Sequence, residues 1–201
     1  MKYLFIDSAT TNLVVAIIND GKIAYIYNNN DNHDTSSKMM PVLAEAFENV
    51  GLKPQDIDKI FAVTGPGSFT GIRVGLTVAK TMAYTLNIPI VPISSLEVMA
   101  SGNGGTALIN ARRGYVFAGT YDNDLNNVYP DSYVLMNDSL AKPYISYDNF
   151  DFETIKPDID VLKVVKKHEN DEAVNPHTIN PNYLKLTEAE EKLKSHDRES
   201  E

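Results

Sequence analysis

The alternation of hydrophobic and polar positions predicts short strands interspersed with helices. Apolar and β-branched runs predict strands over residues 2–6, 13–18, 22–27, 59–63 and 88–93. Apolar residues at helical spacing predict helices that cover about residues 36–50, 68–86 and 95–101. Asn19-Asp20-Gly21 is a strong turn signal, so the second and third strands should form an antiparallel hairpin. This pattern indicates the α/β class.

The second half of the chain is predicted to contain mainly strands. They are expected over residues 106–110, 115–121, 132–136, 143–147 and 161–165. Gly102-Asn103-Gly104-Gly105 is typical of a linker. We therefore expect an N-terminal lobe over residues 1–101 and a smaller C-terminal lobe over residues 102–201. Residues 180–186 should return to the first lobe, and residues 187–201 should form a charged tail.

A glycine turn joins the strand over residues 59–63 to the helix that follows. Gly65 and Gly67 flank a proline, which lets the backbone turn sharply, and Ser68 and Thr70 are placed to cap the helix. The free N–H groups of such a helix start favour an anion, although a capped turn without a ligand is an equally good reading. The turn does not fit a P-loop, because no Lys-Ser/Thr pair follows Gly71. The spacing of its glycines does not fit a dinucleotide fingerprint either.

The helix after this turn carries a small residue at every fourth position. Gly71, Gly75, Ala79 and Ala83 form one smooth stripe on which another backbone can approach closely. Glycine inside a helix costs roughly 1 kcal/mol against alanine, so close packing should compensate. The packing partner is either the protein's own sheet or a helix of another chain.

Composition narrows the possible functions. With 18 basic and 27 acidic residues the net charge is −9, which would repel a phosphate backbone, so the chain alone should bind RNA weakly. The chain has no cysteine, which excludes disulfides and thiolate catalysis. It shows neither a signal-peptide pattern nor an apolar run long enough to span a bilayer. We expect a cytoplasmic protein without a membrane partner.

At the glycine turn the residues resemble a known family. Gly65-Pro-Gly-Ser-Phe-Thr-Gly-Ile-Arg-Val-Gly75 is similar to the signature of bacterial tRNA threonylcarbamoyladenosine biosynthesis proteins of the TsaB (YeaZ) type. Phe5–Thr10, Val91–Leu96, Asn110–Gly114 and Pro181–Leu184 extend the resemblance. The family usually has an aspartate where Asn110 stands. The likeness is strong up to about residue 120 and thin from there to about residue 175.

The resemblance implies an actin-like ATPase (ribonuclease H-like) fold, with two lobes of mixed sheet flanked by helices. It places a degenerate phosphate-binding loop at the start of the chain. The implied nucleotide-binding residues are Asp7, Ser8, Thr10, Gly65, Gly67 and Ser68. Ala9 stands where the superfamily usually has glycine, so a turn in which Asp7 bonds its own backbone is at least as good a reading. The chain is expected to have no cofactor of its own, with ATP or ADP at most at a complex interface.

The resemblance also implies partners. It predicts a non-catalytic scaffold that binds and activates a TsaD-type catalytic subunit. A TsaE-type ATPase is expected to join this complex, and tRNA is expected to be contacted only through the complex. In isolation the chain is expected to form a homodimer. The predicted partner interface comprises Met39, Leu43, Phe47, Gly71, Ile72, Gly75, Leu76, Ala79, Met82 and Ala83. No metal site is predicted, and His33 is read as a loop residue. The alternative is an active ATP-dependent enzyme of the actin and sugar kinase superfamily; a glycoprotease finds no supporting motif.

Overall fold

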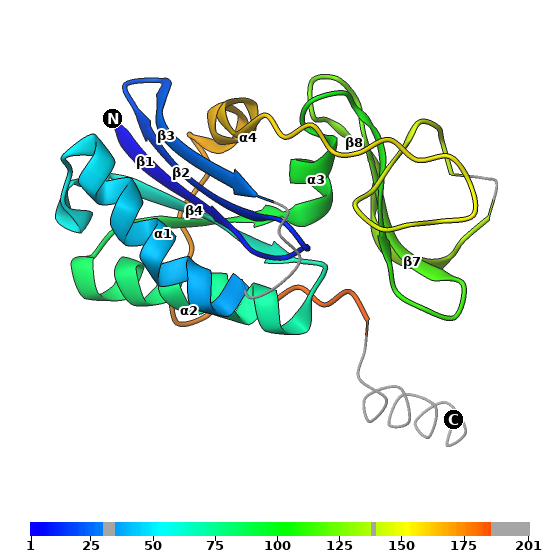
Figure 1. The fold of residues 1–201 in the computed structure, drawn as a ribbon, viewed down its shortest axis with the longest axis horizontal. Coiled ribbons are helices and arrows are strands. Elements are labelled where there is room, and N and C mark those ends of the chain that lie inside the picture. Colours follow the sequence, from blue (N-terminus) through cyan, green and yellow to red (C-terminus); the bar gives the residue numbers. More distant parts are fainter. Residues whose placement is uncertain (30–34, 138–139, 186–201) are drawn as a thin grey trace, which may run out of the picture.

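The computed structural model describes residues 1–29, 35–137 and 140–185, which form two mixed sheets side by side (Figure 1). The first sheet has the order β3-β2-β1-β4-β5. Its strands are β1 Lys2–Asp7, β2 Leu13–Asn19, β3 Lys22–Asn29, β4 Lys59–Gly65 and β5 Ile90–Ser94. β1, β2 and β3 pair antiparallel, whereas β4 pairs parallel with both β1 and β5. The predicted hairpin is confirmed: Asp20 and Gly21 both have positive φ, as a primed turn requires.

Helices cover both faces of this sheet because its strands are apolar on both sides. Alternate residues such as Leu4 and Ile6 pack under α1 (Thr35–Val50) and α2 (Phe69–Leu86), which lie side by side on one face (Figure 1). The intervening residues, Tyr3 and Phe5 among them, pack with α3 (Ser95–Ala100) and α4 (Val161–His168) on the other face. A short 3₁₀ turn, η1 (Pro54–Asp56), precedes β4.

The prediction of a strand over residues 161–165 is wrong, because this segment is the first part of α4. The Asp160 side chain caps it by accepting a 2.9 Å hydrogen bond from the Lys163 N–H. Val161, Val164 and Val165 are buried at i, i+3 and i+4, which is helical spacing. Three basic residues occupy the last turn, where the helix dipole favours positive charge.

The second sheet has the order β8-β7-β6-β9. Its strands are β6 Gly105–Asn110, β7 Tyr115–Tyr121, β8 Asn127–Leu135 and β9 Tyr144–Ile145. β6, β7 and β8 pair antiparallel in sequence, and the two-residue β9 pairs parallel with β6. The strand predicted over 132–136 therefore begins earlier, and the one predicted over 143–147 is shorter.

The Asp131 carboxylate ties the second sheet to the first. Asp131 of β8 accepts hydrogen bonds from the hydroxyls of Ser94, at the end of β5, and of Tyr121, the latter at 2.7 Å. Gly119 makes room for this carboxylate, because a Cβ there would lie 2.2 Å from Asp131 Oδ1. Burial raises the pKa of Asp131 despite the two hydroxyl hydrogen bonds, which lower it. Ser94 also caps α3 by accepting from the Leu96 N–H.

The C-terminal segment returns to the first sheet, as predicted. The Asn182 N–H donates a 2.7 Å hydrogen bond to the carbonyl of Thr64 in β4. Lys80 of α2 donates to the carbonyl of Ile179, also at 2.7 Å. The predicted tail over residues 187–201 and the loop residue His33 lie outside the described residues.

Candidate functional site

The glycine turn after β4 lies against the turn that follows β1. The Ser68 N–H donates a 2.6 Å hydrogen bond to the carbonyl of Ala9, which joins the two turns directly. Gly67 has a φ of +152°, and a Cβ there would stand 2.0 Å from the Ala9 oxygen. Gly65 has a φ of +113°, and a Cβ there would stand 2.6 Å from the carbonyl oxygen of Asn182. Only glycine fits these positions, so the sequence signature encodes a close contact between two backbones.

Ser68 caps α2, as predicted. Its Oγ accepts a 3.1 Å hydrogen bond from the Gly71 N–H at the first turn of the helix. The backbone N–H of Ser68 is already bonded to Ala9. The Ser68 N–H and Oγ, with which such a turn could hold a phosphate, are therefore already hydrogen-bonded within the chain.

The turn after β1 is likewise bonded to itself. Asp7 is only 2% exposed, and its Oδ1 accepts a 2.8 Å hydrogen bond from the Ala9 N–H. Burial raises the pKa of Asp7 to about 7, although the hydrogen bond from Ala9 lowers it. Ser8 donates to the carbonyl of Gly71 at 2.7 Å, and Thr10 accepts from the Asn12 N–H at 3.2 Å.

The structure thus brings the six predicted nucleotide-binding residues together, but their contacts do not fit a bound phosphate. Asp7 forms the self-bonded turn that was the alternative reading. A carboxyl whose pKa is about 7 is partly protonated at neutral pH, which makes it a poor group for orienting a hydrated cation. Nucleotide binding at these residues stays a prediction. In the described part of the chain, no group of three or more His, Cys, Asp or Glu side chains could hold a metal.

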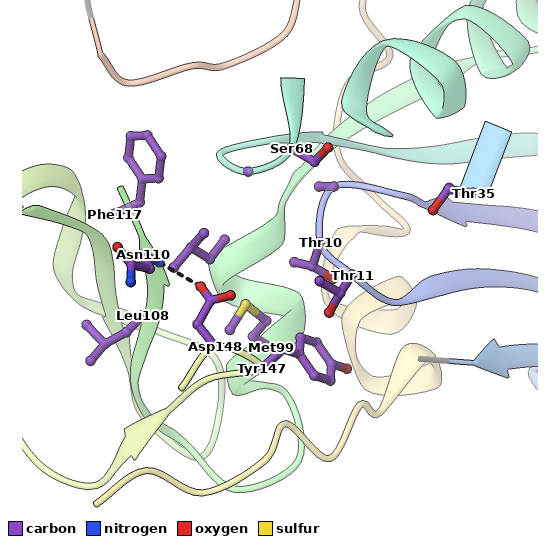
Figure 2. A pocket seen from close by; sticks show the side chains of 13 residues that line it. Thr10, Thr11, Thr35, Ser68, Met99, Leu108, Asn110, Phe117, Tyr147 and Asp148 are labelled. Atoms are coloured by element: carbon purple, nitrogen blue, oxygen red, sulfur yellow. Dashed lines mark hydrogen bonds between the residues drawn. The ribbon is translucent and has the colours of Figure 1, made fainter. Parts of the chain in front are cut away.

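A cavity of about 320 Å³ opens between the two sheets beside these turns (Figure 2). Thr10, Thr11 and Ser68 line one side, and residues of the second sheet and its following loop line the other. There the Asn110 N–H donates a 2.7 Å hydrogen bond to Asp148, drawn as a dashed line in Figure 2. The cavity is lined by hydroxyl, amide and carboxylate groups together with apolar side chains.

Tyr147 connects this cavity to the interior of the first sheet. Its hydroxyl accepts a 2.9 Å hydrogen bond from Asn12, whose amide also donates to Asn28 at 2.6 Å. Burial and the nearby Asp7 carboxylate raise the pKa of Tyr147, so the phenol stays protonated. A partly buried polar network at this side of the cavity therefore links the two lobes.

The small-residue stripe packs on the protein's own sheet, so the expectation of an exposed docking stripe is wrong. A Cβ on Gly71 would lie 2.1 Å from the Ser8 carbonyl oxygen, and one on Gly75 would lie 2.3 Å from Ser8 Oγ. The predicted interface residues that are buried are Gly71, Ile72, Gly75, Leu76, Ala79, Ala83 and, on α1, Met39, Leu43 and Phe47. The physical reason is that only small residues let α2 approach β1 and β4 this closely.

A second face of the same two helices is apolar and open. We call it the outer groove; it has a volume of about 440 Å³ and runs between α1 and α2 on the side away from the sheet. Its lining comprises Met40, Leu43, Ala44, Phe47, Pro54, Thr77, Val78, Thr81 and Met82. Met40 is 58% exposed. Leu43, Phe47 and Met82 of the predicted interface therefore line this groove.

Sequence reasoning missed the threonines and Pro54 of the outer groove. The sequence did contain a signal for this groove, because α2 carries apolar residues on two faces. One face is the buried stripe, and the other carries Val78 and Met82. It also missed the pairing of Glu97 with His168, because α4 was read as a strand. The Glu97 carboxylate accepts a hydrogen bond from Lys167 and lies 2.9 Å from His168 Nε2.

Comparisons with known proteins identify the relatives of this chain. The family model described as "TsaD: tRNA N6-adenosine threonylcarbamoyltransferase" matches residues 29–163. The protein of Bacillus subtilis (strain 168) named "tRNA threonylcarbamoyladenosine biosynthesis protein TsaB" is 31% identical, with 96% of this chain and 97% of that protein covered. The Escherichia coli (strain K12) protein of the same name is 33% identical, over 74% of this chain and 65% of that protein.

The fold has a solved counterpart. "YeaZ from Pseudomonas aeruginosa" superimposes with a TM-score of 0.75 at 19% identity, covering 91% of this chain and 99% of that one. The two mixed sheets with helices on both faces define a protein of the actin-like ATPase fold. Within that class, the chain belongs to the TsaB family of tRNA threonylcarbamoyladenosine biosynthesis proteins. No helix in the described ranges is long and apolar enough to cross a membrane.

Proposed function

We propose that this chain is the non-catalytic scaffold subunit of the complex that forms threonylcarbamoyladenosine on tRNA, where it binds and activates a TsaD-type catalytic subunit. The observation that carries the proposal is the outer groove, an open apolar face in a chain whose relatives are named for this pathway. An apolar groove between two helices fits an amphipathic helical face of a partner.

The occupied turns support a role without catalysis. The Ser68 N–H, the Asp7 carboxyl and the Ser8 hydroxyl all bind within the chain. Each of these groups would have to leave its present partner before it could contact a phosphate. The chemistry then belongs to the partner, and ATP or ADP would be bound at most at an interface of the complex.

The remaining partners follow from the same role. A TsaE-type ATPase joins the assembled complex, and tRNA is held mainly by the complex rather than by this acidic chain. When the catalytic subunit is absent, the outer groove pairs with a second copy, because an open apolar face tends to bury itself. The complex works in the cytoplasm.

A matched pair of variants tests the docking role. Ala44 and Asn49 are both exposed on α1, but only Ala44 lines the outer groove. Ala44→Glu should abolish association with the TsaD-type subunit and should reduce homodimerisation, whereas Asn49→Glu should leave both unchanged at equal melting temperature. Association that is insensitive to Ala44→Glu would show that the groove is not the docking surface.

Reconstitution tests the absence of catalysis. The purified chain alone should make no threonylcarbamoyladenosine from threonine, bicarbonate, ATP and tRNA, and it should not turn over ATP. Adding the partner proteins should restore synthesis. Steady-state ATP hydrolysis by the isolated chain would favour the alternative, an active enzyme of the actin and sugar kinase superfamily.

A further inference from the structure

Charge is unevenly distributed along this chain. Residues 59–121 contain one acidic residue, Glu97, and five basic residues, which are Lys59, Arg73, Lys80, Arg112 and Arg113. This segment therefore has a balance of +4 within a chain of net charge −9. Glu97 is buried and paired with Lys167 and His168. Residues 173–185 also lack carboxylates and contain Lys185.

Where these two segments meet, an arginine lies on an aromatic pair made of the exposed Phe69 and the partly buried Tyr183. The Arg73 guanidinium is 3.8 Å from the centroid of the Phe69 ring, and that ring stacks on Tyr183 with centroids 5.2 Å apart. Arg73 Nε donates a 2.9 Å hydrogen bond to the Tyr183 hydroxyl, which uses one of the five N–H donors of the guanidinium. Phe69 is 56% exposed although it is a large apolar side chain.

A second cluster of the same composition lies on the second sheet. Lys185 Nζ is 5.4 Å from the centroid of the Tyr133 ring, and Tyr133 stacks on Tyr115 at 4.7 Å with an interplanar angle of 12°. Tyr115 is 37% exposed and directly follows the exposed turn that carries Arg112 and Arg113.

The two clusters form one surface, because Tyr183 and Lys185 belong to the same short segment. Figure 1 shows this segment running past the start of α2 toward the second sheet. We call the surface the aromatic–basic strip; it consists of Phe69, Arg73, Tyr115, Tyr133, Tyr183 and Lys185. Phe117 contacts Tyr133 at 5.6 Å and also lines the interlobe cavity, so the strip reaches the cavity rim.

We propose that the aromatic–basic strip binds an unpaired stretch of RNA. This inference rests on the proposed function, and it assigns part of the tRNA contact to this subunit. Exposed rings offer stacking faces to any base, and the neighbouring cations meet the phosphates between the bases. Flat rings alternating with cations suit bases and phosphates better than they suit a protein partner, whose anchors need a desolvated pocket such as the outer groove. The acidic remainder of the chain keeps the affinity low until the complex holds the RNA.

Binding of a fluorescently labelled 12-nucleotide single-stranded RNA to the full chain tests the strip by anisotropy at low salt. Phe69→Ala should raise the Kd roughly tenfold through lost stacking. Arg73→Glu should raise it similarly and should lower the slope of log K against log salt by about one. The controls are Tyr84→Ala, a ring 62% exposed near the other end of α2, and Lys22→Glu on β3, and both should stay within about twofold of the wild type.

Equal affinity of the strip variants and the controls would overturn the proposal. So would strip variants that leave RNA binding unchanged but weaken association with the catalytic subunit, because the surface would then contact a protein. In the reconstituted complex, the strip variants should raise the KM for tRNA and leave the KM for threonine unchanged. Failure of the chain to associate with the catalytic subunit would refute the proposed function. The RNA-binding measurement on the isolated chain would still test whether the strip binds RNA.

Discussion

The hydroxyl of Ser8 donates a 2.7 Å hydrogen bond to the carbonyl of Gly71, so the end of β1 and the first turn of α2 are in direct contact. Next to this bond, Gly71 and Gly75 leave no space for a side chain. The small residues of α2 are therefore required by the packing of the chain on itself. The surfaces that we propose for partners are the outer groove and the aromatic–basic strip.

Enlarging these glycines should destabilise the isolated protein. A Cβ at Gly71 meets the backbone oxygen of Ser8, which cannot rotate away, so Gly71→Ala should lose more by overpacking than the roughly 1 kcal/mol it gains in helix propensity. Gly75→Leu should cost about 3 kcal/mol or more, because it overpacks against Ser8 and Ile6. Urea unfolding measures both.

Thr77→Leu is the control for these variants, because Thr77 is exposed on the same helix and points into the outer groove. It should change the free energy of unfolding by less than about 0.5 kcal/mol. A Gly75→Leu protein as stable as the wild type would mean that the stripe is not core. In that case the stripe would again be a candidate for partner docking.

The buried Asp7 carboxyl should make stability fall as the pH rises. Its pKa is about 7 in the folded chain against an ordinary 3.8, so the folded state favours the protonated form. The contribution is fully present below about pH 4 and is lost as the pH passes through 7. Asp7→Asn keeps an acceptor for the Ala9 N–H and does not titrate. Its stability advantage over the wild type should grow from pH 5 to pH 8 by at most about 3 kcal/mol, because only about two pH units of this range lie below the folded pKa.

Urea unfolding of both proteins at pH 5, 6, 7 and 8 measures this difference. An advantage of Asp7→Asn that is constant across the range would contradict the raised pKa. The same titration bears on the phosphate hypothesis, because a carboxyl that holds its proton near neutral pH is not available as an anion for a cation.

The sequence predicted most of the first lobe because its signals are local. The Asp20-Gly21 turn dictates the hairpin, and glycines with positive φ at Gly65 and Gly67 dictate the sharp turn before α2. The return of the C-terminal segment was predicted, but not its contacts, because the bond between Asn182 and Thr64 joins residues far apart in sequence and no local pattern identifies such a pair.

The remaining elements could not be predicted from the sequence where one residue pattern is compatible with two structures. Val161 to Val165 is β-branched and short, which favours a strand, but the Asp160 cap and the burial of every third or fourth residue make it a helix. Similarly, small residues at every fourth position of α2 fit packing on the protein's own sheet or on another chain. Periodicity gives the face of a helix, but it does not identify the neighbour that covers that face.

A charged cluster on the far side of the first sheet should give the protein a second pH dependence, in which the histidine acts in the same direction as Asp7 and the glutamate in the opposite direction. His168 of α4 lies 2.9 Å from Glu97 of α3 through Nε2, and its Nδ1 lies 2.6 Å from Asp171. Lys167 also donates to Glu97, at 2.8 Å, and to the carbonyl of Leu125. Together these contacts hold α4 against α3.

The directions of the two pKa shifts define the pH window of this cluster. Burial alone would lower the pKa of His168, but its hydrogen bonds to Glu97 and Asp171 outweigh burial and raise it above 6.5. Burial alone would raise the pKa of Glu97, but hydrogen bonds from His168 and Lys167 hold it below 4.5. The His168 contribution is fully present below about pH 6.5 and is lost as the pH rises through its folded pKa. The Glu97 contribution is present above about pH 4.5 and is lost in acid.

His168→Gln should therefore destabilise the protein more at pH 6 than at pH 9. Loss of a hydrogen-bonded charge pair should cost about 2 kcal/mol at pH 6, and the difference from the wild type should shrink toward pH 9 as the wild-type imidazole loses its proton. Glu97→Gln provides the second arm of a double-mutant cycle, because without the carboxylate the effect of His168→Gln should lose most of its pH dependence. Chemical denaturation of all four proteins at both pH values measures the coupling. A coupling energy that is the same at pH 6 and pH 9 would mean that His168 interacts with Glu97 in its neutral form, so that protonation of the imidazole does not help to hold α4 against α3.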